Sequence, residues 1–456
     1  MTLMRVAARP RLAAARDLRG MMQGRVVAMG DDAYAETRQI WNGAVDHRPA
    51  LFALCETPSD VQAAMRVART HSLPLSVRGG GHDWAGRALC HDGLVVDLSA
   101  MRRVGIDPKA RVATVTGGAT AADLIAAAAP HRLVAVTGTV GAVGMAGLTL
   151  GGGYGPLSGR FGLALDNLLG AELVLADGRR VSADETEHPD LYWALRGGGG
   201  NFGVVTSLKI RLHELRSLLA GLILFPWPEA PQVLRRYAEA MVMAPDELTV
   251  SAGVLSGPGG DPVLFLAPAW SGAPEQGEHV MATLQQLGTP LWVHLGAMSS
   301  AELLGLFDNH VVNGRYYALQ TRWLPALMPE TIAAIVTAGG ARSSPYSAIV
   351  LHHFHGAATR VPLRATAFGI RREHFLLEVI AAWEPGDESE RGIHRRWAQK
   401  LSQALAPSAL PGGYANLLGP TEHDQIARAY SNIARLQEVK RRFDPDRIFA
   451  SALSLP

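Results

Sequence analysis

Three glycine-rich segments in the first half of the chain constrain its fold more than any other feature. They cover residues 78–82 (RGGGH), 137–155 (TGTVGAVGMAGLTLGGGYG) and 197–203 (GGGGNFG). Glycine lets backbone N–H groups approach a ligand without an intervening Cβ, and consecutive amides form concavities that bind anions. A tight turn would explain one such segment about as well. The three together indicate a large, extended cofactor that contains a pyrophosphate.

A nicotinamide-binding Rossmann fold is the obvious alternative for a glycine-rich chain. It requires G-x-G-x-x-G between a strand and a helix, with an acidic residue about 20 positions later. The best match begins at Gly153 and Gly155, but the third glycine falls one position late, at Gly159. The next acid, Asp166, follows too closely. The spacing therefore disfavours this alternative.

The length and composition set further limits. A chain of 456 residues predicts two or three domains. A formal net charge of +2, with dispersed arginines, gives no reason to expect a nucleic acid or a membrane as partner. The two cysteines, Cys55 and Cys90, are expected to be buried free thiols. No apolar run has membrane-spanning length and residues 1–20 do not resemble a signal peptide, so a cytoplasmic location is expected.

The pattern of predicted elements changes at about residue 217. Before it, short strands alternate with glycine loops, and a helix over 60–71 is expected to begin after Ser59 as its N-cap. After it, longer helices alternate with strands, which is typical of an antiparallel sheet covered on one side, an α+β arrangement. A single helix is expected over 422–443.

Residues 74–86 (PLSVRGGGHDWAG), 136–178 and 191–208 (LYWALRGGGGNFGVVTSL) resemble the FAD domain of the berberine-bridge-enzyme-like oxidases. These belong to the vanillyl-alcohol-oxidase or p-cresol-methylhydroxylase class of flavoproteins. The resemblance continues to the C-terminus and covers nearly the whole chain in order. It implies a two-domain, α+β, p-cresol-methylhydroxylase-type fold with an antiparallel-sheet substrate domain. The expected limits are 30–215 for the FAD-binding domain, 216–413 for the substrate domain, and 414–456 for a segment that returns to complete the first.

The resemblance assigns a role to His82, which closes the first glycine segment. In the family, this histidine is bonded to the 8α-methyl group of FAD. Many relatives carry a second bond from a cysteine, but Val140 occupies that position here. A single covalent linkage is therefore expected. Contacts to FAD are expected from Arg78, Gly79, Gly80, Gly81, His82, Thr137, Gly138, Thr139, Val143, Gly144, Gly147, Gly151, Gly152, Gly153, Tyr154, Gly155, Asn167, Asn201, Gly203 and Val205.

Tyr414 matches a tyrosine that several carbohydrate- and alcohol-oxidising relatives use as a base. Asn416 would lie on the same face if the segment is a strand, and both are predicted catalytic residues. A core position for Tyr414 is the alternative. On a predicted strand, His353 and His355 would share one face and His352 the other. One of the three could contact substrate, and packing explains at least two. No metal site is predicted.

The resemblance implies an enzyme that oxidises a small alcohol, sugar or amine by hydride transfer to flavin, with molecular oxygen as acceptor and H2O2 as product. Met145 stands where relatives have smaller aliphatic side chains, and Arg447 replaces an asparagine of the C-terminal pattern. These departures leave two alternatives open. One is a flavin dehydrogenase of the same fold that avoids oxygen, and the other is a flavin-binding protein without turnover.

Overall fold

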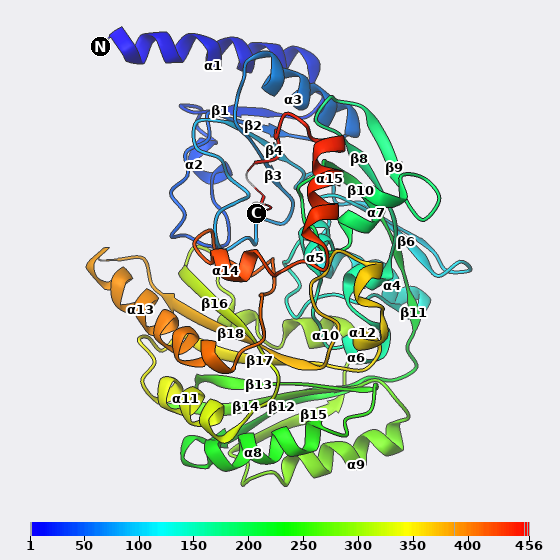
Figure 1. Ribbon diagram of the computed structural model, residues 1–456, viewed down its shortest axis with the longest axis vertical. Helices are drawn as coiled ribbons and strands as arrows, with labels where there is room; N and C mark the ends of the chain where they lie inside the picture. The colour runs from blue at the N-terminus through cyan, green and yellow to red at the C-terminus, as the bar shows by residue number, and fades with distance from the viewer. Residues whose placement is uncertain (1, 387, 451, 454, 456) are drawn as a thin grey trace.

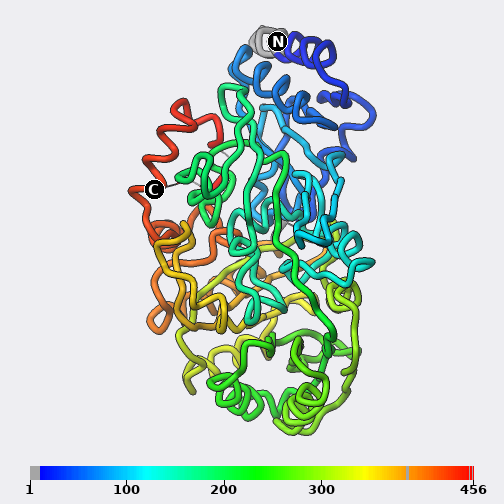
Figure 2. Tube along the Cα trace, turned by 90° about the vertical axis from the view of Figure 1, so that its right-hand side faces the viewer, coloured from blue at the N-terminus to red at the C-terminus, as the bar shows by residue number. Residues whose placement is uncertain are grey.

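The computed structural model describes residues 2–386, 388–450, 452, 453 and 455, so part of the C-terminal stretch lies outside them. The molecule is elongated, and the two ends of the chain share its upper half (Figures 1 and 2). The middle of the chain forms the lower half. This division matches the expected α+β fold with a separate antiparallel sheet, while the predicted domain limits stay predictions.

The upper half contains two sheets. In the first, the order is β1-β2-β4-β3, with β2, β3 and β4 parallel. Strand β4 is buried at every position because it lies between two neighbours. The second is antiparallel, in the order β5-β6-β10-β8-β9. The strands are β1 Val26–Ala28, β2 Leu51–Leu54, β3 Leu75–Arg78, β4 Leu94–Asp97, β5 Val104–Asp107, β6 Val112–Thr116, β8 Leu168–Val174, β9 Arg180–Ala183 and β10 Val204–Arg211, with a separate pair, β7 Leu133–Val134 and β11 His213–Glu214.

The lower half is one antiparallel sheet in the order β15-β12-β14-β13-β17-β18-β16. Helices α8, α9, α11 and α13 cover one of its faces, and the other faces the upper half (Figure 1). In α8, the buried Val233, Leu234, Tyr237 and Met241 recur at helical spacing toward the sheet. The strands are β12 Leu219–Pro226, β13 Leu248–Ser256, β14 Pro262–Trp270, β15 Trp292–Ala297, β16 Tyr316–Leu324, β17 Ala348–Phe354 and β18 His374–Trp383.

The helices complete the two halves. Those of the upper half are α1 Thr2–Met21, α2 Tyr34–Thr37, α3 Pro58–Thr70, α4 Ala121–Ala128, α5 Met145–Gly151, α6 Ser158–Phe161, α7 Pro189–Leu195, α14 His423–Ile426 and α15 Ile433–Phe443. Those that pack on the large sheet are α8 Ala230–Met241, α9 Pro274–Gln285, α11 Pro329–Gly340 and α13 Glu388–Leu405. Two short helices, α10 Ser300–Gly305 and α12 Ala357–Arg360, contact α4 and α6 of the upper half.

Two predicted helix limits are wrong. The N-cap of α3 is Thr57 rather than Ser59, because Thr57 and Asp60 form a reciprocal capping box. The single helix expected over 422–443 is broken into α14 and α15. Between them Tyr430 forms an isolated antiparallel bridge with Phe368, which a continuous helix cannot make. Asn432 then caps α15 by accepting a hydrogen bond from the Arg435 amide.

Candidate functional site

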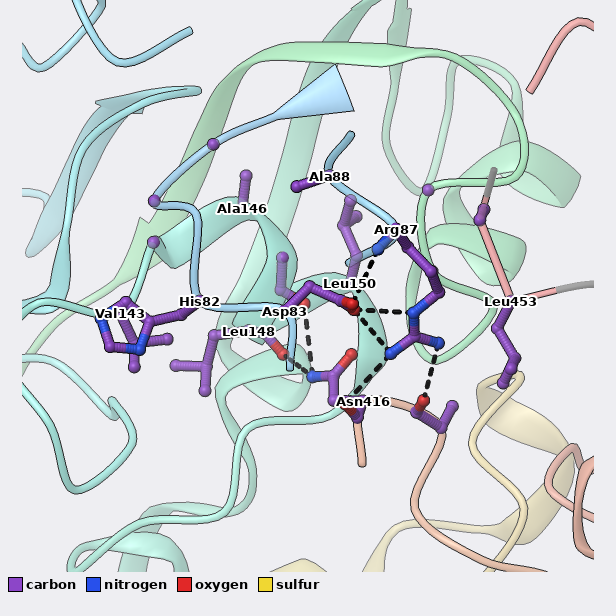
Figure 3. Close-up of a pocket in the computed structure, with 18 of the residues that line it drawn as sticks. His82, Asp83, Arg87, Ala88, Val143, Ala146, Leu148, Leu150, Asn416 and Leu453 are labelled. Carbon is purple, nitrogen blue, oxygen red and sulfur yellow. Dashed lines mark hydrogen bonds and ion pairs between the residues drawn. The ribbon is translucent and has the colours of Figure 1, made fainter. Parts of the chain in front are cut away.

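The three glycine segments meet in one cavity of about 360 Å³ between the two halves of the molecule. Its wall includes side chains from the first segment, from α5 and from the turn after residue 413 (Figure 3). Of the predicted FAD contacts, the following line it: Gly79, Gly80, Gly81, His82, Gly138, Thr139, Val143, Gly144, Gly147, Tyr154, Asn201, Gly203 and Val205. Both predicted catalytic residues, Tyr414 and Asn416, line it as well.

The backbone of this cavity fits a large cofactor. A Cβ added to Gly80 would lie 2.4 Å from the amide nitrogen of Gly144, so the first two segments touch only because both residues are glycine. At Gly147, Gly199 and Gly200, an added Cβ would meet no atom within 4 Å. These three residues line the cavity, so the missing side chains leave their backbone accessible. A pyrophosphate suits such a surface.

His82 lies in the cavity wall with its ring beside Trp41. The two rings are nearly parallel, with centroids 5.3 Å apart. Burial lowers the pKa of His82 to about 4, because the charged imidazolium loses its hydration there. The imidazole is therefore neutral at physiological pH, with one ring nitrogen free of a proton. This is the form that can act as a nucleophile.

Val140 also lines the cavity, and neither cysteine does. Cys55 is fully buried, and its thiol donates to the carbonyl of Ala53. Cys90 points toward the carbonyl groups of Pro74 and Leu94. Burial raises the pKa of both thiols, which disfavours the reactive thiolate. The expectation that both cysteines are buried free thiols is confirmed for Cys55, while Cys90 is only half-buried.

Tyr414 and Asn416 lie on a turn rather than on a strand, yet their side chains touch. The Nδ2 atom of Asn416 donates to the hydroxyl of Tyr414 at 3.0 Å, and the Gly153 amide donates to the same oxygen at 2.8 Å. Burial raises the pKa of Tyr414 to about 12, and the two donated bonds only partly offset it. The phenol is thus protonated at neutral pH. Because both of these bonds are accepted ones, its own hydrogen is left to be donated.

Arg78 does not line this cavity, although it begins the first glycine segment. Its guanidinium donates to Asp97, which is opposite it in the parallel register of β3 and β4. It also donates to the carbonyl groups of Thr37 and Gln39 at 2.6 and 3.2 Å. Arg78 therefore holds the C-terminal end of β3 through contacts outside this cavity.

The other predicted contacts do not line the cavity: Thr137, Gly151, Gly152, Gly153, Gly155 and Asn167. A Cβ at Gly151 would meet the Asn416 side chain at 2.0 Å, and one at Gly152 would meet the Tyr414 ring at 2.7 Å. These glycines therefore make room for the two predicted catalytic side chains.

Three of the others, Thr137, Gly155 and Asn167, make local hydrogen bonds. Thr137 donates to the carbonyl of Gly138 at 3.1 Å. The amide of Gly155 donates to Ser158 at 2.9 Å. Asn167 donates to the carbonyl groups of Phe161 and Leu163 at 3.0 and 2.9 Å.

The histidines on and directly after β17 separate as the alternation predicts. His353 and His355 are buried and stacked, with ring centroids 4.3 Å apart, and neither lines the cavity. His352 lies on the opposite face and does line it. Its Nε2 atom is 3.3 Å from Oε1 of Glu378 on β18, and its Nδ1 atom is 3.3 Å from the Ser251 hydroxyl.

Sequence reasoning missed Glu378 and the pair Asp83 and Arg87, all of which line the cavity. Glu378 is the one acidic residue in the apolar run HFLLEVIAAW, and a lone carboxylate in such a strand is a usable signal. Asp83 and Arg87 follow His82 directly and form an ion pair of 2.6 Å. Their i, i+4 spacing in a glycine-containing loop gives no such signal.

No group of three or more His, Cys, Asp or Glu side chains is placed to hold a metal ion in the part of the chain that the structure describes. Within the same residues, no helix is long and apolar enough to span a membrane.

Comparison with known proteins identifies the family. An FAD binding domain model matches residues 49–184, and a model described as "Berberine and berberine like" matches 413–456. (R)-6-hydroxynicotine oxidase of Paenarthrobacter nicotinovorans is 31% identical over 450 residues, covering 94% of this chain and 95% of the relative.

Two solved structures have the same fold. The structure of 6-hydroxy-D-nicotine oxidase from Arthrobacter nicotinovorans superposes with a TM-score of 0.86 at 29% identity, covering 95% of this chain and 98% of the other. Glucooligosaccharide oxidase from Acremonium strictum, described with a 6-S-cysteinyl, 8α-N1-histidyl FAD, gives 0.85 at 22% identity and covers 97% and 98%. The chain therefore belongs to the berberine-bridge-enzyme-like family of FAD-linked oxidoreductases.

Proposed function

We propose that this protein is an oxidase that holds FAD through one covalent bond to His82 and oxidises a small amine. The observation that carries this proposal is the set of groups that line a single cavity. It combines the glycine-lined backbone, a neutral His82, and a carboxylate and imidazole pair, Glu378 and His352. Bound FAD would supply the acceptor for a hydride, a pair of electrons with one proton.

The single linkage rests on the residues around His82. The neutral imidazole is the reactive form, and Trp41 restricts the orientation of the ring by stacking on it. Val140 has no atom that could form a second bond to the cofactor. The Acremonium strictum enzyme is described with both a cysteinyl and a histidyl linkage, so its cofactor differs from the one proposed here.

Glu378 favours an amine among the possible substrates. It lines the cavity close to Tyr154 and Tyr414, whose rings are neutral. A carboxylate attracts a substrate ammonium group and can accept its N–H proton. The relative of 31% identity is named for the oxidation of a hydroxynicotine, which is consistent with an amine.

Tyr414 and Asn416 stay proposed catalytic residues, with the role of Tyr414 changed. A phenol with a pKa of about 12 is a poor base at neutral pH, so the proton acceptor is assigned to Glu378. Tyr414 instead donates its hydrogen to a bound ligand. Asn416 holds its hydroxyl in place at 3.0 Å. In the proposed reaction, the substrate C–H bond provides the hydride and Glu378 takes the N–H proton. O2 then accepts the two electrons and two protons and becomes H2O2.

The test combines cofactor chemistry with kinetics. The purified protein is precipitated with acid, and flavin retained in the pellet is mapped to a peptide by mass spectrometry. A panel of secondary amines, alcohols and sugars is then mixed anaerobically with the protein. Bleaching by amines but not by alcohols or sugars supports the proposal. Bleaching by sugars or alcohols alone would overturn the substrate class.

Two further outcomes correspond to the alternatives. If air-saturated buffer reoxidises the bleached protein slowly and without H2O2, the protein is a dehydrogenase. If no member of the panel bleaches the flavin, the protein binds flavin without turnover, and the proposed function is rejected.

A further inference from the structure

The segment that follows His82 holds three successive carbonyl groups of the turn that carries Tyr414. Arg87 donates through Nη1 to the carbonyl of Ala415 at 3.4 Å and through Nη2 to that of Asn416 at 3.2 Å. Trp84 donates through Nε1 to the carbonyl of Leu417 at 2.9 Å. Figure 3 shows the guanidinium of Arg87 between Asp83 and Asn416. Contacts across more than 300 residues of sequence thus connect the two segments.

Asp83 fixes the orientation of this guanidinium. Its Oδ2 atom accepts from Nε of Arg87 at 2.7 Å, and its Oδ1 atom accepts from the Arg87 amide at 3.0 Å. The Arg87 and Asp83 side chains are 18% and 23% exposed, respectively, so water competes only weakly with these bonds. The planar guanidinium can bind a carboxylate and two carbonyl groups at once, which a lysine ammonium cannot do with the same geometry.

The turn itself transmits any displacement to the cavity. The carbonyl of Tyr414 accepts from the amides of Leu417 and Leu418 at 2.8 and 3.1 Å, so residues 414–418 move together. Asn416 donates to the Tyr414 hydroxyl and to the carbonyl groups of Gly147 and Leu148 in α5. A shift at residue 415 or 416 therefore changes the position of the Tyr414 hydroxyl relative to α5.

We propose that Arg87 is a positioning residue that fixes the Tyr414 turn relative to the segment bearing His82. The inference rests on the proposed function only for its kinetic consequence. Arg87 is paired with Asp83, so its part is geometric rather than a net charge in the cavity. Through it, the residue that holds the cofactor and the residues that contact substrate form one rigid unit.

Arg87→Lys tests the proposal in the full-length, flavin-loaded protein. Hydrogen–deuterium exchange is followed in the peptide covering 414–419, together with acid-stable flavin content and the Tm. We expect faster exchange at the Leu417 and Leu418 amides, with flavin content and Tm close to those of the wild type. Anaerobic flavin reduction by the best amine should slow by roughly 10- to 100-fold, since small displacements of reacting groups have effects of this order. The substrate Kd should change little.

Arg102→Lys is the matched control. Arg102 also forms a two-bond ion pair, with Asp123 at 2.8 and 2.9 Å, but it lies outside the cavity and is half exposed. Its exchange and reduction rates should equal those of the wild type. Asp83→Asn is a second variant. It weakens the ion pair that orients the Arg87 guanidinium, so it should also speed exchange in the peptide covering 414–419.

Several results would overturn the inference. One is wild-type exchange at 414–419 in both Arg87→Lys and Asp83→Asn. Another is faster exchange with an unchanged reduction rate. A third is a fall in Tm and flavin content that accounts for the whole kinetic loss, which would make Arg87 merely structural. If the wild type is not reduced by any substrate, the proposed function fails, while the exchange measurement still decides whether Arg87 holds the turn.

Discussion

The Nε2 atom of His352 lies 3.3 Å from Oε1 of Glu378, and both side chains face the cavity that the glycine segments form. The two residues occupy neighbouring strands, β17 and β18, at diagonal positions of the antiparallel register. Their side chains are 13% and 19% exposed, so the pair is partly screened from bulk water. The imidazole is thus within ion-pair distance of the carboxylate that is proposed to accept the substrate proton.

Glu378→Gln should slow anaerobic flavin reduction by about 100-fold or more, the range in which loss of a general base falls. The amide keeps the shape of the side chain but cannot take a proton. Glu373→Gln is the control, because Glu373 pairs with His353 at 3.0 Å outside the cavity. A loss of less than about tenfold in Glu378→Gln would reject the assignment, because it falls below the range for a general base.

His82→Ala should abolish acid-stable flavin. The glycine-lined backbone is unchanged in this variant, so FAD should still bind reversibly and be released by acid. The control is His91→Ala, since His91 is 64% exposed and does not line the cavity. Acid-stable flavin in the His82→Ala protein would show that the attachment point is elsewhere.

Tyr414→Phe should lower the reduction rate by roughly tenfold or more and leave two donors, the Gly153 amide and Asn416, without their acceptor. Because the pKa of Tyr414 is about 12, the wild-type rate should show no Tyr414-dependent change between about pH 6 and 9. Tyr237→Phe is the control. It removes a buried hydroxyl that donates to Val250 at 2.8 Å outside the cavity, and it should affect stability alone. If the reduction rate instead rises near pH 8 in the wild type but not in Tyr414→Phe, Tyr414 acts as a base.

The glycine segments could be predicted from sequence because their chemistry is local, since a run of glycines exposes backbone wherever it folds. His82 is joined to one such run, but its role as the attachment point follows from the family resemblance alone. Arg78 belongs to the same run, but its partner Asp97 is set by the register between β3 and β4. Nothing in the local sequence determines that register, so the sequence could not show that the Arg78 side chain contacts Asp97 rather than the cavity.

Glu378 and the break near Tyr430 depend on still longer contacts. The pairing of Glu378 with His352 requires the register of two strands separated by a helix and a loop. Tyr430 leaves the helical path because residue 368 offers it a bridge partner. Helical periodicity predicts an apolar helix face over 422–443, but it carries no information about this competing contact. The side chains proposed to contact substrate are thus the least predictable part of the site.

Acid should destabilise the folded protein through its buried histidines. Burial lowers the pKa of His353 and His355 to about 4 and that of His374 to about 3. In the unfolded chain these groups titrate at about 6.5, so below that pH the unfolded state binds more protons than the folded state. The resulting stabilisation is complete above about pH 6.5 and is lost progressively as the pH falls toward 4.

Denaturant titrations at pH 7 and pH 5 measure this effect. The free energy of unfolding should fall by an amount on the order of several kcal/mol, since each buried histidine contributes up to about 1.4 kcal/mol per pH unit. His355→Gln removes one of these groups, a residue that is 4% exposed and whose ring stacks on that of His353. It should reduce the difference in unfolding free energy between pH 7 and pH 5. His91→Ala removes an exposed imidazole and should leave the difference unchanged. Equal pH dependence in His355→Gln and the wild type would show that His355 does not stay neutral in the folded protein.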